Sequence, residues 1–315
     1  MPHRYTNQDP THRPHGPAAI VRWGLVDRLL GRRQRQPPGP PAATAAPDIE
    51  RIHGKSKVPW LTWLGHASFL GALAGRRFLI DPVFSAHAGW LYRRFQPPPL
   101  ATHQLPRIDA VMVTHNHYDH LDVESIRALP SGVPVVVPSG LGAWMRRQDR
   151  QKVIELGWWQ RTVIGELTIT LVPACHWSRR GIFDTNRALW GGYVISGGGH
   201  SVYHSGDTAT FEGFAEIGRR FPALDAAMLP IGGYEPGWFM EHYHLNPEQA
   251  GRAFVDLGAR RLVPMHWGTF QLTDEPLCEP INRMRSWWQD QGPENPRQLK
   301  VLDIGASLKF EGHDD

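Results

Sequence analysis

The chain has 315 residues, of which 41% are hydrophobic and 20% charged, which is the composition of a globular protein with a substantial core. Its two cysteines, Cys175 and Cys278, exclude a disulfide framework, and no run of about 18 apolar residues predicts a membrane-spanning helix. The net charge of +4 suits an anionic partner, and the N-terminus lacks a secretory signal pattern, so we expect a cytoplasmic protein.

Residues 1–47 differ in composition from the rest of the chain. We predict that they form an N-terminal extension before a folded domain of residues 48–315. Residues 1–17 are rich in Pro, His and polar side chains, which predicts disorder. Residues 37–47, PPGPPAATAAP, are typical of a proline-rich linker.

Residues 18–36 carry apolar side chains at helical spacing together with five arginines. One interpretation is an amphipathic helix that lies on an anionic membrane surface. The other is a helix that docks on the protein itself. Gly24 and Asp27 weaken the amphipathic pattern and favour the second interpretation.

From residue 48 onward, short β-type runs alternate with helical patterns, which indicates an α/β domain. The runs predicted as strands are VPWLTWLG (58–65), RRFLIDP (76–82), IDAVMVT (108–114), VPVVVP (133–138), LTITLVP (167–173), GGYVIS (191–196), SVYHS (201–205), DAAMLPI (225–231), RLVPM (261–265), KVLDI (300–304) and SLKF (307–310). The clearest helix is predicted over 246–259, because Asn246 suits the N-cap, Gln249 the capping box and Gly258 the helix end.

The segment THNHYDHLD (114–122) places His115, His117, Asp119 and His120 within six positions, directly after a predicted strand. Loops at the ends of strands commonly carry active sites. His115 and His117 alternate in extended backbone, so both can point to the same side. Imidazole and carboxylate groups are ligands for zinc and similar divalent ions. A metal site is favoured over a polar turn, because four ionisable groups packed together without a cation would be costly.

Three more candidate ligands directly follow predicted strands: His176, Asp207 and His266. Each alone would pass for an ordinary core or surface histidine or a turn-capping aspartate. Strand ends of one layer meet at a common edge, so we expect these side chains to join the THNHYDHLD cluster. The acidity of Asp207 suits a carboxylate that bridges two metal ions, but the spacing does not divide the seven residues between two sites.

Three neighbouring residues have other interpretations. Asp81, which follows another strand, either hydrogen-bonds a ligand histidine or forms a turn before Pro82. Asp122 is interpreted as the N-cap of a helix over 123–129. Cys175 would point away from His176 in an extended strand end, so we interpret it as a packing residue.

Together these motifs resemble the metallo-β-lactamase superfamily, and more closely the family of N-acyl-phosphatidylethanolamine-hydrolysing phospholipases D and its bacterial relatives. The resembling stretches run in order from about residue 60 to 270: WLGHASF (63–69), LIDPVFS (79–85), THNHYDHLD (114–122), NRALWGGYVI (186–195), HSGDT (204–208), LPIGGYEPGWFMEHYHLNPEQA (229–250) and MHWGTF (265–270). The ligand motif indicates the superfamily, whereas GGYEPGWFM and MHWGTF are more specific. The resemblance implies a four-layer αββα sandwich with the metals at one edge of its sheets.

The resemblance also implies two zinc ions per chain, or another divalent metal. One ion would be held by His115, His117 and His176, the other by Asp119, His120 and His266, and Asp207 would bridge them. The implied reaction cleaves an N-acyl-phosphatidylethanolamine-like lipid to phosphatidic acid and an N-acylethanolamine, by attack of a hydroxide shared between the metals.

Two residues have catalytic roles in this interpretation. Asp119 would orient the hydroxide while it holds its metal ion. His244 matches a family histidine close to the site. It would donate to the leaving oxygen or bind phosphate, or else only support the ligands.

The aromatic residues beside the motifs would line an apolar groove for acyl chains or belong to the core; they are Trp177, Tyr234, Trp238, Phe239 and Trp267. The alternative enzyme is a lactonase of the same superfamily. A nuclease is disfavoured because the arginines lie mostly in the N-terminal tail, so no nucleic-acid partner is expected. A non-enzymatic metal-stabilised binding module is disfavoured by the full ligand set. Peripheral membrane contact and a homo-oligomer stay open.

Overall fold

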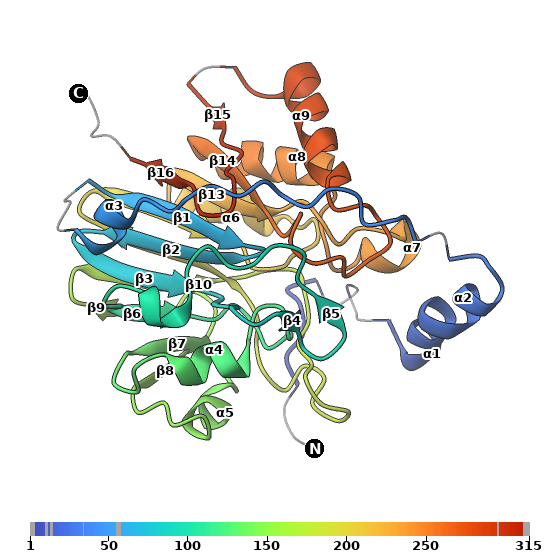
Figure 1. Ribbon diagram of the computed structural model, residues 1–315, viewed down its shortest axis with the longest axis horizontal. Coiled ribbons are helices and arrows are strands. Elements are labelled where there is room, and N and C mark those ends of the chain that lie inside the picture. The colour runs from blue at the N-terminus through green and yellow to red at the C-terminus, as the bar shows by residue number, and fades with distance from the viewer. Residues whose placement is uncertain are drawn as a thin grey trace.

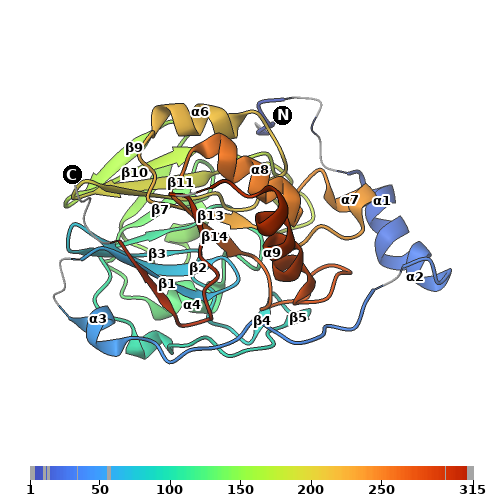
Figure 2. The same cartoon turned by 90° about the horizontal axis from the view of Figure 1, so that it is seen from above.

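Two mixed β-sheets of seven strands each lie face to face in the computed structural model, and helices cover their outer faces (Figures 1 and 2). This is the four-layer αββα sandwich that the resemblance implied. The structure describes residues 4–9, 12, 15–33, 35–54, 58–294 and 296–310.

The first sheet has the order β16 (Ser307–Lys309), β1 (Trp60–Gly65), β2 (Ser68–Leu73), β3 (Arg76–Ile80), β6 (Ala110–Met112), β7 (Val135–Pro138) and β8 (Val153–Leu156). The second has the order β15 (Gln298–Leu299), β14 (Arg261–Met265), β13 (Ala226–Pro230), β12 (His200–His204), β11 (Gly192–Gly197), β10 (Leu167–Val172) and β9 (Arg161–Ile164). A separate hairpin joins β4 (His87–Ala88) and β5 (Tyr92–Arg93).

Helices α3 (Ile49–His53), α4 (Val123–Ala128) and α5 (Gly142–Arg146) lie on the side of the first sheet, and α6 (Gly213–Arg220), α8 (Pro247–Leu257) and α9 (Glu279–Gln291) on the side of the second (Figure 2). Short helical turns are formed by η2 (Thr102–Gln104) and α7 (Gly237–Met240).

The side chains of the first sheet pack on both of its faces, one against the second sheet and the other against helices. In β1, Leu61 and Trp63 belong to the core that includes the second sheet, whereas Trp60 and Leu64 pack with residues of α4 and α5. Successive side chains of a strand point to opposite faces, so a strand that is apolar throughout can serve both layers.

Strand direction determines where the loops gather. β1 is antiparallel to β2, β2 is antiparallel to β3, and β3 is parallel to β6, so β1, β3 and β6 run the same way. By the same reasoning β10, β12, β13 and β14 share one direction in the second sheet. The loops after these strands therefore gather at one end of each sheet.

Most of the predicted strands are present, and the helix predicted over 246–259 is confirmed as α8, with Asn246 and Gln249 forming the capping box and Gly258 left-handed at its end. The strand predicted at KVLDI (300–304) is wrong. The strand that pairs with β14 is β15, which lies before this segment in the chain. After β15 the chain crosses to the first sheet and forms β16. A crossing segment cannot stay in one ladder, and Ile304 makes only an isolated bridge to Thr44.

The N-terminal segment lies along the domain. The segment predicted as a linker is hydrogen-bonded to it, with Ala42 N–H donating to the carbonyl of Gly268 at 2.9 Å and Ala42 fully buried. The disorder predicted for residues 1–17 is not what the described part of that segment shows, because Asn7 is buried against His176. The domain boundary near residue 48 stays a prediction.

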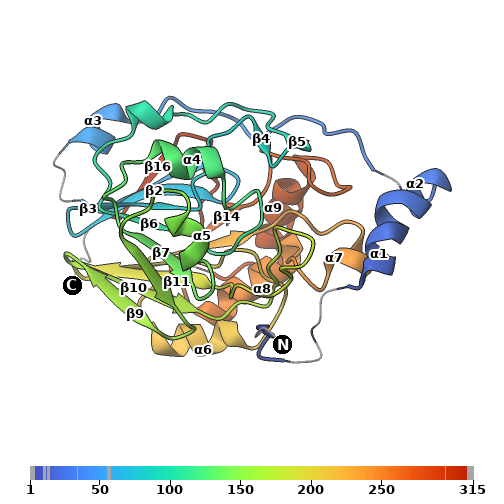
Figure 3. The same ribbon diagram turned by 90° about the horizontal axis from the view of Figure 1, so that it is seen from below.

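Residues 17–29 form a helix in three sections, α1 (Pro17–Val21), the π-helical η1 (Arg22–Val26) and α2 (Asp27–Leu29), beside α7 (Figure 3). Gly31, with φ of 62°, lies just beyond its end, where a left-handed residue commonly terminates a helix. The predicted range of 18–36 is therefore too long at its end. Among the described residues, no helix combines the length and apolarity that crossing a membrane requires.

Candidate metal centre

The structure brings the seven predicted ligands together at the edge where the parallel strands end: His115, His117, Asp119, His120, His176, Asp207 and His266. Four of them lie on the loop between β6 and α4, and the others follow β10, β12 and β14. Asp122 is the N-cap of α4, accepting from the backbone N–H of Ser125, as predicted. The position of the cluster therefore follows from strand direction.

The first group consists of His115, His117, His176 and Asp207. His117 Nδ1 lies 2.9 Å from His115 Nε2 and 3.2 Å from His176 Nε2. Asp207 Oδ2 lies 3.9 Å from the Nε2 atoms of both His115 and His176. Four tetrahedral ligands of a zinc ion are about 3.3–3.6 Å apart, so these four atoms surround a space of suitable size.

The second group consists of His66, Asp119, His120 and His266, and a third, overlapping group consists of Asp207, His244 and His266. Asp119 Oδ2 lies 3.6 Å from His120 Nε2 and 3.4 Å from His266 Nε2. Asp207 Oδ2 lies 3.1 Å from His120 Nε2, and its Oδ1 lies 3.3 Å from His266 Nε2. Asp207 thus lies close to histidines of both groups, as a bridging carboxylate would, and the division of the seven residues between two metal ions stays a prediction.

Buried polar atoms without partners indicate what the cluster lacks. His120 Nε2, His266 Nε2 and Asp207 Oδ1 are buried and make no hydrogen bond of good geometry. Buried polar groups in proteins are almost always satisfied, and an explanation is needed where they are not. A divalent cation would satisfy these atoms, so the donor set fits the metal sites that the sequence predicted.

Charges in the cluster raise some pKa values and lower others. Burial lowers the pKa of His117 to about 4 and that of His176 to about 3. Burial also acts to lower the pKa of His266, but the carboxylates of Asp207 and Asp119 outweigh it and raise that pKa to about 9. The same carboxylates raise the pKa of His120. A metal ion in the second group must therefore displace protons, so its affinity falls as pH falls.

Asp81 lies behind the ligands. Its carboxylate accepts from His120 Nδ1 at 2.7 Å and from both the N–H and the hydroxyl of Thr114, also at 2.7 Å. These bonds set the ring orientation of His120 and leave its Nε2 directed at the second group. The sequence left two interpretations open for Asp81. The structure agrees with the first, because Asp81 is hydrogen-bonded to the candidate ligand His120.

His66 was missed by the sequence reasoning. It follows β1, and its Nε2 donates to Asp119 Oδ2 at 2.9 Å, within the group formed by Asp119, His120 and His266. Burial lowers the pKa of His66 to about 3, so the ring is neutral. The rule that identified His115 and His266, a histidine directly after a strand, applies equally to the end of WLTWLG.

Sharp turns direct these side chains into the site. His66, Asp81 and His266 directly follow β1, β3 and β14, and they have φ values of 52°, 42° and 62°. Left-handed backbone is uncommon outside glycine, although His and Asp adopt it more often than most residues. Such strain occurs characteristically at functional sites, where the surrounding fold enforces it.

His244 lies beside the shared carboxylate. Its Nδ1 is 3.8 Å from Asp207 Oδ2 and has no hydrogen-bond partner. Burial lowers its pKa to about 3, so it is neutral. A neutral imidazole keeps one N–H, so His244 can donate a hydrogen bond to a bound molecule.

The aromatic residues divide between core and site. Trp267 is buried and stacks on Trp63, and Tyr234 is buried and donates to Glu279. Trp177 contacts the His117 ring with centroids 4.7 Å apart, so it borders the metal centre. Trp238 is 37% exposed and has the Arg22 guanidinium over its ring.

Comparison with known proteins agrees with this geometry. Residues 76–267 match the family described as the Beta-lactamase superfamily domain. The chain belongs to the metallo-β-lactamase superfamily. With both ligand groups present, it is a metal-dependent hydrolase of that superfamily.

Two superfamily relatives are notably similar in sequence. N-acyl-phosphatidylethanolamine-hydrolyzing phospholipase D 1 of Caenorhabditis elegans is 36% identical over 272 residues, covering 81% of this chain and 76% of that protein. An uncharacterized protein of Mycobacterium tuberculosis is 38% identical over 278 residues, covering 84% and 72%.

Among solved structures, Igni18, a metallo hydrolase of Ignicoccus hospitalis, has a TM-score of 0.60 at 25% identity, covering 81% of this chain and 99% of that one. The metallo-β-lactamase fold protein YhfI of Bacillus subtilis has a TM-score of 0.56 at 17% identity, covering 79% and 99%, which is a likeness of fold.

Proposed function

We propose that this superfamily member is a di-zinc phosphodiesterase of phospholipase D type that cleaves N-acyl-phosphatidylethanolamine-like lipids to phosphatidic acid and an N-acylethanolamine. The observation that carries the proposal is the pair of ligand groups sharing Asp207, in a chain 36% identical over 81% of its length to a phospholipase with that activity in its name. The seven ligands favour zinc because they combine imidazole and carboxylate groups.

Bound at the two groups, zinc ions would acidify a water molecule and neutralise charge that develops on the phosphoryl oxygens. The protein residues supply position and proton handling. Asp119 belongs to the second group and accepts a hydrogen bond from His66. Its carboxylate can orient the attacking water. His244, on the other side of Asp207, is placed to donate to the leaving oxygen or to hold phosphate.

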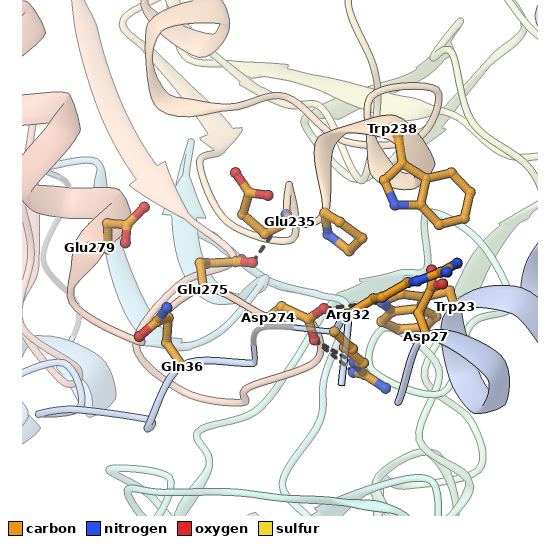
Figure 4. A pocket seen from close by; sticks show the side chains of 11 residues that line it. Trp23, Asp27, Arg32, Gln36, Glu235, Trp238, Asp274, Glu275 and Glu279 are labelled. Atoms are coloured by element: carbon orange, nitrogen blue, oxygen red, sulfur yellow. Dashed lines mark hydrogen bonds and ion pairs between the residues drawn. The ribbon is translucent and has the colours of Figure 1, made fainter. Parts of the chain in front are cut away.

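The N-terminal helix packs against the segment that carries Glu235 and Trp238. Trp23 stacks on Phe239 with centroids 5.2 Å apart. Trp23 Nε1 donates to the carboxylate of Asp274 (Figure 4). Arg33 Nε donates to the same carboxylate. A cavity of about 400 Å³ remains between this helix and the segment of Glu235 and Trp238. The helix thus docks on the protein, as the sequence pattern favoured.

The rest of the helix leaves an apolar stripe unpaired. Leu25 is 54% exposed and Leu29 is 75% exposed, at a spacing of one helical turn. Arg28 and Arg32, beside the stripe, are also exposed. Leucines flanked by arginines suit the surface of an anionic bilayer, so we propose that this protein contacts an anionic membrane surface through the exposed side of this helix.

Hydrolysis by the purified, zinc-loaded protein tests the proposal. We expect release of N-acylethanolamine and phosphatidic acid from an N-acyl-phosphatidylethanolamine in mixed micelles, and none from the Asp207→Ala variant. A protein that retains two zinc ions but leaves this lipid intact, while opening lactones or cleaving other phosphodiesters, would refute the lipid substrate and keep the hydrolase.

A further inference from the structure

The N-terminal segment contacts the backbone of a candidate metal ligand. Asn7 Oδ1 accepts from the backbone N–H of His176 at 3.0 Å, and Asn7 Nδ2 donates to the carbonyl of His176, also at 3.0 Å. Asn7 Oδ1 also accepts from Trp190 Nε1 at 3.2 Å. Asn7 is only 8% exposed, so these bonds are largely shielded from water.

His176 needs such a partner because of where it lies. It follows β10 in irregular backbone, and it is 1% exposed. Buried backbone N–H and C=O groups without hydrogen-bond partners are strongly destabilising. The amide side chain of Asn7 pairs with both the N–H and the carbonyl of His176, as the backbone of a neighbouring strand would.

A second hydrogen bond fixes the orientation of the His176 ring. His176 Nδ1 donates to the carbonyl of Tyr243 at 2.9 Å, which leaves Nε2 directed at the first ligand group. The Tyr243 hydroxyl accepts from the backbone N–H of His15. The His15 ring stacks on Phe239 of α7, with centroids 5.0 Å apart. The N-terminal segment therefore joins two loops, one carrying His176 and the other carrying His244.

We propose that Asn7 is a positioning residue for the metal site of His115, His117 and His176, and that its contacts, together with those of His15, keep His176 in ligand geometry. The proposal rests on the two metal sites of the proposed function and not on its lipid substrate. Outer contacts of this kind typically change metal affinity by roughly 10–100-fold when they are removed.

The test measures zinc affinity by competition with a chromophoric chelator in the full chain, for Asn7→Ala, Asn7→Asp and the matched control Gln8→Ala. Gln8 is an exposed amide next to Asn7. We expect Asn7→Ala to weaken one of two zinc ions by roughly 10–100-fold and the other by much less. Asn7→Asp keeps the acceptor but loses the donor to the His176 carbonyl, so it should also weaken that ion. Gln8→Ala should bind as the unaltered protein does.

The visible spectrum of the cobalt-loaded protein gives a second readout that a general loss of stability would not produce. A changed ligand-field band at one of two cobalt ions in Asn7→Asp would support a positioning role. Two unchanged affinities and unchanged bands in folded Asn7→Ala and Asn7→Asp would overturn it. An unaltered protein that fails to bind two metals would instead refute the metal sites.

Discussion

At the residue scale, Asp207 is the side chain on which the two-metal arrangement depends. Among the described residues, only its carboxylate contacts histidines of both ligand groups, His115 and His176 on one side and His120 and His266 on the other. The other histidines belong to one group each, except His266, which lies in two overlapping groups. A change at Asp207 should therefore affect both sites, whereas a change at any one histidine should affect mainly its own.

We expect Asp207→Ala to weaken zinc at both sites by more than the roughly 10–100-fold typical of outer contacts, because a shared ligand is lost outright. Elemental analysis after dialysis should find fewer than one zinc ion per chain. The control is Asp256→Ala, an exposed carboxylate on α8. If Asp207→Ala retains both ions, the bridging assignment is wrong.

Variants of His66 test whether its hydrogen bond to Asp119 is needed for metal binding. We expect His66→Ala to weaken zinc mainly at the second site, by roughly 10-fold or more, because Asp119 loses the donor at 2.9 Å. His66→Gln can still donate and should recover part of the affinity. Zinc titrations of both variants against the chelator give the comparison. Equal losses from Ala and Gln would show that the ring itself is needed, as a ligand would be.

At the element scale, the helix of residues 17–29 has two surfaces with different partners. Trp23 packs on α7, while Leu25 and Leu29 contact solvent. The proposed membrane contact requires this division, with one surface docked on the protein and the other left exposed.

We expect the double variant Leu25→Ser, Leu29→Ser to bind vesicles of phosphatidylcholine and phosphatidylglycerol roughly tenfold more weakly, because two exposed leucines no longer enter the bilayer. Sedimentation with vesicles measures this, and binding should also weaken as salt rises. The control replaces Val163 and Val255, which are exposed on β9 and α8, by serine. Equal binding of both double variants would contradict a membrane role for the stripe.

At the scale of the whole molecule, metal and fold are coupled, because the ligands come from both sheets. We expect metal removal to lower Tm. Zinc at 100 times its dissociation constant stabilises by about 2.7 kcal/mol per site, which is roughly 5 °C in a chain of this size. Calorimetry before and after dialysis against a chelator measures the change, and added zinc should restore it. An unchanged Tm would contradict ligation across the two sheets.

Much of this site was predictable from the sequence because one rule places it. A His or Asp just beyond a strand identified His115, His176, Asp207 and His266, and strand direction gathers such residues at one edge. His66 obeys the same rule and could have been found. The division between the two groups could not be derived from spacing, because it depends on how the two sheets are stacked.

Asn7 could not have been found in this way. It contacts His176 across 169 positions of sequence, from a segment whose composition predicts disorder. Its role depends on hydrogen bonds to the backbone N–H and carbonyl of His176, and a sequence pattern does not show where such bonds form. The edge strand β15 escaped prediction for a similar reason, because its pairing is determined by where the chain crosses between sheets.

The most direct test of the central claim is the metal content of the purified chain, measured by elemental analysis after exhaustive dialysis against metal-free buffer. The two ligand groups joined by Asp207 predict two zinc ions, or two ions of another divalent metal, per chain. One ion or none would contradict the two-site arrangement, and with it the proposed chemistry of the THNHYDHLD loop.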